Sequence, residues 1–246
     1  MRVPNPWKGI GAQPREIWAL CAATLVNRVG TMIVPFLVLY LTESRHFSES
    51  AAGGVLALYG FGSLIASPIS GSLSDRLGPL RVMIAALALA GTIALTFPFL
   101  PGFAPVVAAA FAYALVGELV RPASLTIVST YSDPERRKAA FALNRMVINL
   151  GMSIGPALGG FLSAVSFPLL FWVDGATSIA GAAVLFLATR SARRRAPLAS
   201  GGTRATGVSA RGLRDRRLLH ALLAIVPVGI VFFQFESALP LYLVRQ

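Results

Sequence analysis

The amino-acid sequence predicts an all-α membrane protein, and composition and hydropathy patterning carry that prediction. Hydrophobic residues make up 55% of the 246 residues and charged residues only 13%, whereas a soluble domain carries about 25% charged residues. The mean hydropathy is +0.70, and the apolar residues form long blocks separated by short polar segments. Because lipid offers no hydrogen-bond partners to an exposed backbone, each block is expected to be a helix.

The blocks also define the expected domain organisation. A helix needs about 20 residues to cross a hydrocarbon core of about 30 Å. Seven blocks meet this requirement, at residues 17–41, 51–70, 81–100, 105–128, 140–165, 169–188 and 219–243. We therefore expect a six-helix bundle at residues 1–188, a basic cytoplasmic linker at 189–217, and a seventh transmembrane helix in 218–246 that begins an incomplete second half.

Lysine and arginine in the loops predict the orientation. Basic residues precede the first span and crowd the second, fourth and sixth loops, whereas the third and fifth loops carry no charge. The positive-inside rule then places the N-terminus and the even-numbered loops in the cytoplasm, for a multi-pass protein of the cell membrane. The net charge of +12 has the same origin, because the arginines lie between apolar blocks and form no separate nucleic-acid-binding domain.

A short charged segment joins the second and third spans. Its chemistry-bearing residues are Gly71, Asp75, Arg76, Gly78 and Arg81. Glycine permits close helix approach or a tight turn, and the aspartate can interact with a helix N-terminus or an arginine. The pattern, at this place in the topology, resembles the signature loop of the major facilitator superfamily of secondary transporters. That family usually has two basic residues directly after the second glycine, where this chain has Pro79 and Leu80.

The fifth span contains a second pattern of small residues. Its members are Gly151, Gly155, Pro156, Gly159 and Gly160. Small residues four apart form a groove for close helix packing, and the proline removes a backbone donor and permits a kink. The pattern resembles the motif of proton-coupled antiporters within the same superfamily. The resemblance implies two six-helix halves, of which this chain covers the first and the start of the second.

Polar residues at membrane depth are the candidate site. An ionised side chain at the bilayer centre costs roughly 2.5–3.5 kcal/mol, so each requires a reason. Asn27 and Arg28 lie near the middle of the first span, and Glu118 and Arg121 share a face of the fourth. The resemblance implies that both spans line a central cavity. We expect Glu118 to carry the proton, with Arg28 or Arg121 controlling its protonation, and Glu236 of the seventh span to contribute.

Other readings of these polar residues stay open. Glu118 and an arginine can equally form a static buried ion pair. Arg145 and Asn149, at the inner end of the fifth span, are expected to be structural. Asp174 follows Trp172 near the outer end of the sixth span and is expected at the membrane interface.

The predicted function is secondary active transport, most simply proton-coupled efflux of small molecules by alternating access. The proton gradient is the expected energy source, with no cofactor and no metal. An enzyme is not expected, because the sequence has no Walker phosphate loop and no nucleophile elbow, and its two histidines lie far apart. Besides the small-molecule substrate and the bilayer, the expected partner is the C-terminal half if the chain is a fragment.

Two alternatives and one open question accompany this prediction. The chain can be a truncated product that does not transport alone, or a membrane interaction module that pairs through residues 151–160. An uptake symporter would keep the fold and reverse the direction. The charge of the substrate is left open, since Arg28 and Arg121 suit an anion and Glu118 and Glu236 suit a cation.

Overall fold

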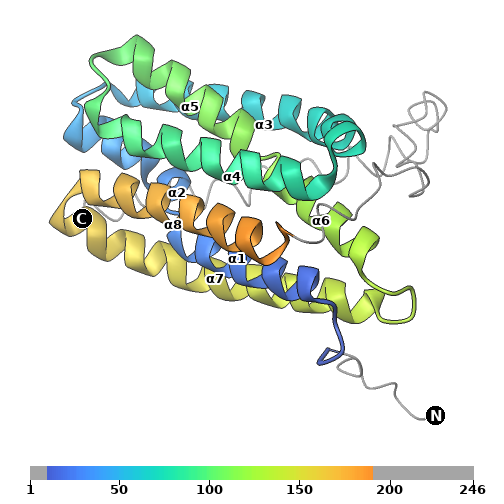
Figure 1. Cartoon of the computed structure of the whole chain (residues 1–246). Coiled ribbons are helices and arrows are strands. Elements are labelled where there is room, and N and C mark those ends of the chain that lie inside the picture. Colours follow the sequence, from blue (N-terminus) through green and yellow to red (C-terminus); the bar gives the residue numbers. More distant parts are fainter. Residues whose placement is uncertain (1–9, 191–246) are drawn as a thin grey trace, which may run out of the picture.

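A computed structural model describes residues 10–190 and shows a helical bundle without strands in that part of the chain (Figure 1). Six segments of it are long and apolar enough to cross a membrane: Arg15–Ser44, Glu49–Ala66, Pro79–Phe99, Phe103–Tyr131, Arg137–Val165 and Phe167–Ala188. These segments confirm the first six predicted spans. The expected seventh span, nearly all of the linker, and Glu236 lie outside the described residues.

Spans one and four are each interrupted near the middle. Span one consists of α1 (Arg15–Gly30), α2 (Ile33–Leu39) and a π-helical turn, η1 (Tyr40–Ser44). Span four consists of α5 (Phe103–Gly117) and α6 (Val120–Tyr131). The sequence predicted one helix in each place, so the two breaks correct that prediction. A helix end in lipid leaves N–H and C=O groups unpaired, so each break requires partners from other helices.

The segment between spans two and three is much shorter than predicted. Helix α3 (Glu49–Leu77) continues through Gly71, Asp75 and Arg76, and α4 (Pro79–Thr96) begins directly after Gly78. Gly78 alone makes the turn, with φ 86° and ψ 141°, a backbone conformation that suits only glycine. The charged residues were read as a loop, but α3 keeps its helical hydrogen bonds through them because their side chains are exposed.

A 3₁₀ turn, η2 (Phe97–Phe99), and two long helices, α7 (Arg137–Val165) and α8 (Phe167–Ala188), complete the bundle. The most extensive contacts join α4 with α8, α1 with α8, α1 with α7, and α3 with α5. When spans one, two and three are exchanged for spans four, five and six, the contact of α1 with α7 (spans one and five) becomes the contact of α5 with α3 (spans four and two). The same exchange places the break of span one on the break of span four, as expected of two inverted three-helix repeats.

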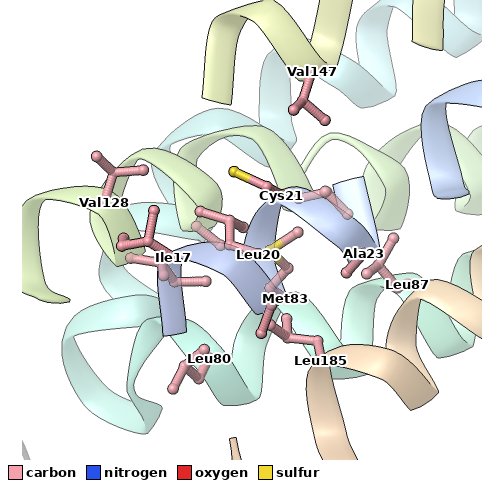
Figure 2. Close-up of a cluster of buried hydrophobic side chains, with 14 of the residues drawn as sticks. Ile17, Leu20, Cys21, Ala23, Leu80, Met83, Leu87, Val128, Val147 and Leu185 are labelled. Atoms are coloured by element: carbon pink, nitrogen blue, oxygen red, sulfur yellow. The ribbon is translucent and has the colours of Figure 1, made fainter. Parts of the chain in front are cut away.

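Two buried apolar clusters lie at different depths and leave a polar layer between them. Figure 2 shows the first cluster, which includes Ile17, Leu20, Met83, Leu87 and Leu185. The second includes Met32, Ile33, Leu37, Phe97 and Phe171. Between them along spans one, four and six come the polar residues Asn27, Arg28, Glu118, Asp174 and Ser178.

Candidate substrate and coupling site

Asp174 of α8 caps the break in span one. Its Oδ2 accepts hydrogen bonds from the backbone N–H groups of Met32 (2.9 Å) and Ile33 (3.1 Å), at the start of α2. The Tyr113 hydroxyl of α5 donates to Oδ1 at 3.2 Å. A carboxylate in this position pairs the otherwise unsatisfied donors of the half-helix. The prediction of an interfacial Asp174 was wrong, because its side chain is 0% exposed.

The break in span four is closed from α3. The Ser70 hydroxyl donates to the carbonyl oxygen of Leu119 at 3.0 Å. Glu118 ends α5, where its N–H donates to the carbonyl of Ala114 and its side chain is half-buried. Along span four, Glu118 lies between the residues of the two apolar clusters, as Asn27 and Arg28 do on span one and Asp174 on span six. Glu118 therefore belongs to the same polar layer as the Asp174 network.

A cavity of about 260 Å³ lies between α1, α6 and α7. Its polar lining comprises Thr24, Arg28, Arg121, Ser124, Asn144 and Arg145, and its apolar lining Val120, Leu125, Phe141 and Ile148. The lining includes three arginines and no carboxylate. Within residues 10–190 the only arginine or lysine nitrogen within 4.0 Å of a carboxylate oxygen belongs to the exposed Arg136–Asp133 pair. The cavity lining is therefore positively charged.

The structure separates the residues that the sequence grouped together. Arg28 and Arg121 line the cavity, whereas Glu118 does not. Asn27 turns toward α8, where its Nδ2 donates to the Ser178 hydroxyl at 3.0 Å. A static ion pair between Glu118 and an arginine, the alternative reading, is absent from the part of the chain that the structure describes. The roles of these residues in transport stay predictions.

The sequence did not place Thr24, Ser124, Asn144 or Arg145 among the candidate site residues, although all four line the cavity. Asn144 is 2% exposed and its Nδ2 donates to the Ser124 hydroxyl at 3.2 Å. Arg145 was noted in the sequence only as a structural residue at the inner end of a span. No local pattern could place it beside Arg28 and Arg121, because three different spans meet at the cavity.

The glycine motif of the fifth span packs against span one of the same chain. A Cβ on Gly151 would lie 2.4 Å from the Cβ of Arg28, and one on Gly155 would lie 2.9 Å from the Arg28 carbonyl oxygen. A Cβ on Gly159 would lie 2.6 Å from the ring of Phe36. The three glycines thus seat span one against α7, as small residues do in membranes. Span one already occupies the face that Gly151, Gly155 and Gly159 form, and the alternative of an interaction module that pairs through residues 151–160 stays a prediction.

Six membrane spans with inverted-repeat contacts, two broken helices and an arginine-lined cavity define the class of protein: a polytopic membrane protein built from two three-helix repeats. The chain belongs to the Major Facilitator Superfamily, whose sequence profile matches residues 20–246. The family resemblance predicted from the two glycine patterns is confirmed.

Three curated relatives are similar at low identity. The uncharacterized MFS-type transporter YqjV of Bacillus subtilis is 26% identical over 243 residues, covering 93% of this chain and 56% of the relative. The multidrug resistance protein MdtG of Dickeya zeae is 26% identical over 187 residues (74% and 46%). The quinolone resistance protein NorA of Staphylococcus aureus is 25% identical over 148 residues (60% and 38%). The chain thus spans about half the length, or less, of these relatives.

Solved structures agree on the fold. A variant of the peptide transporter POT in complex with alafosfalin superposes with a TM-score of 0.67 at 23% identity, covering 93% of this chain and 47% of the transporter. POT in complex with sulfate gives a TM-score of 0.63 at 24% identity (92% and 51%). At these identities the comparison establishes the shared helical arrangement.

Proposed function

We propose that the protein exports small molecules across the cell membrane by proton-coupled alternating access, with its N-terminus in the cytoplasm. Two relatives named for multidrug and quinolone resistance support the direction of transport. One observation carries the coupling: Glu118 stands half-buried at the break of span four, inside the polar layer. Neither the Asp174 cap nor an ion pair immobilises it within the described residues.

A carboxyl group at a helix break is suited to carry a proton. The protonated form is neutral and tolerates the low dielectric of the closed state, whereas the ionised form is favoured by water or by nearby arginines. Proton binding therefore changes the relative stability of the outward-open and inward-open states. In the proposed cycle Glu118 takes up a proton from outside and releases it inside, while substrate moves outward. The moving partner is the second six-helix half that the family plan implies.

The test is Glu118→Gln in the full-length protein, reconstituted into proteoliposomes with an imposed pH gradient. A panel of cationic, anionic and neutral fluorescent dyes identifies a transported compound. Glutamine keeps the size and hydrogen-bonding capacity of the side chain and removes its titration. We expect gradient-driven efflux to fall at least tenfold while exchange without a gradient persists.

The matched control is Glu135→Gln, which changes an exposed carboxyl in the connection between α6 and α7. This variant should pump like the wild type. If Glu118→Gln still pumps against a concentration gradient, Glu118 is not the proton carrier. Gradient-driven accumulation in the opposite direction would assign uptake symport instead of efflux.

A further inference from the structure

We propose that the cavity between α1, α6 and α7 is a subsite for the oxyanion group of a small organic acid, and that organic anions are therefore substrates. That organic anions are substrates depends on the proposed transport function. That the cavity binds an oxyanion group concerns binding alone, and it is tested without a gradient.

Charge is the first argument. Arg28, Arg121 and Arg145 come from three different helices and line one cavity whose lining contains no carboxylate. Three like charges that line one cavity repel one another, so an anion bound between them stabilises this arrangement. The planar guanidinium group also matches the two oxygens of a carboxylate or phosphonate, which it binds in bidentate geometry.

Unpaired polar atoms are the second, independent argument. Thr24 Oγ1, Arg28 Nε and Asn144 Oδ1 are buried and have no hydrogen-bond partner within the described residues, and all three residues line the cavity. Thr24 is 5% exposed and Asn144 is 2% exposed. Buried polar atoms in native proteins are nearly always paired, so their convergence on one cavity indicates a ligand.

The unpaired atoms also specify the ligand. The Thr24 hydroxyl and the Arg28 Nε–H can donate to an oxyanion, whereas Asn144 Oδ1 can only accept. A ligand that satisfies all three carries an anionic group next to a hydroxyl or amide N–H. Phe141 and Ile148 add apolar surface to the cavity of about 260 Å³, which favours an organic acid with a ring over an inorganic anion.

The probe that fits this description is mandelate, which carries a carboxylate, a neighbouring hydroxyl and a phenyl ring. Binding is measured by isothermal titration calorimetry on the full-length protein in an uncharged detergent. The comparison compounds are mandelamide, which lacks the charge, and phenylacetate, which lacks the hydroxyl. We expect mandelate to bind at least tenfold more tightly than mandelamide, and severalfold more tightly than phenylacetate.

Two variants test the assignment to this cavity. Arg121→Gln and Arg145→Gln change exposed side chains, so the fold should persist. Each should weaken mandelate binding by about tenfold or more, because each removes a charge-assisted hydrogen bond. Lys138→Gln is the matched control, since Lys138 is an exposed cation on α7 outside the cavity lining.

Three results would overturn the subsite: equal affinity for mandelate and mandelamide, unchanged mandelate affinity in both arginine variants, or no mandelate binding. If mandelate fails and phosphatidylglycerol in nanodiscs stabilises the protein through the same arginines, the site belongs to a lipid phosphate. If mandelate binds but no compound is pumped, the subsite stands and the transport function fails.

Discussion

The separation between α1 and α7 is set by Gly151, and Gly151→Ala perturbs it directly. The added Cβ would lie 2.4 Å from the Cβ of Arg28 and 3.2–3.3 Å from the Arg28 carbonyl carbon and Cα. Carbon atoms in favourable contact lie about 3.5–4.0 Å apart. The two helices must therefore separate locally by roughly 1.1–1.6 Å, since the obstacle is backbone and Cβ and no rotamer change removes it.

The energetic cost follows from this overlap. Overpacking a close contact costs about 1–3 kcal/mol, and alanine regains up to about 1 kcal/mol of helix propensity relative to glycine. Because a distance of 2.4 Å to a Cβ puts the cost at the upper end of that range, the free energy of unfolding should fall by a net value of about 1–2 kcal/mol, which lowers Tm by about 2–8 °C. Mandelate affinity should fall as well, because the displaced residue is Arg28.

Gly160→Ala is the matched control on the same helix. Its Cβ would approach nothing closer than 3.9 Å, so the Tm should stay within about a degree of the wild type or rise slightly. Gly155→Ala should be intermediate, because its Cβ would lie 2.9 Å from the Arg28 carbonyl oxygen. Thermal unfolding of the full-length variants in detergent measures all three. Equal Tm values for Gly151→Ala and Gly160→Ala would refute the close approach.

Two further stability predictions concern the Asp174 cap and the Gly78 turn. Asp174→Ala leaves two backbone N–H groups and the Tyr113 hydroxyl unpaired and should cost about 2–5 kcal/mol of unfolding free energy; Asp174→Asn keeps an acceptor and should cost less. The control is Asp133→Ala at an exposed site, which should leave the Tm unchanged. If Asp174→Ala and Asp133→Ala have the same Tm, Asp174 does not stabilise the break. Gly78→Ala should cost about 1–3 kcal/mol through backbone strain, whereas Gly71→Ala, on a helical turn with open space around it, should be neutral in the same thermal assay.

Hydropathy predicted the six described spans because apolar length is a local property of the chain. The fifth-span glycines were also predicted correctly as a packing face, because spacing by four places them on one side of a helix. Both predictions depend on residues that are close in sequence. The end of α3 was placed too early, since charge was taken to end a helix that in fact continues to Leu77.

The breaks in spans one and four had no comparable signal. Gly30 and Gly117 precede them, but most glycines within residues 10–190 do not interrupt a helix. The breaks are stabilised by Asp174 and Ser70, which are distant in sequence from the groups they pair. The arginine cavity could not be predicted from the sequence for the same reason, because its charges come from three separate spans.

The capping of span one by span six has a consequence for biosynthesis. The Met32 N–H and Asp174 are separated by 142 residues, so the ribosome makes the donor long before the acceptor. At about 5–20 residues per second this interval is roughly 7–28 s. During it, the two amides must be paired by water or by a continuous first helix, because lipid cannot pair them. Insertion of the sixth span therefore completes the first one, and a nascent chain arrested before Asp174 would expose an unfinished helix to the membrane quality-control machinery.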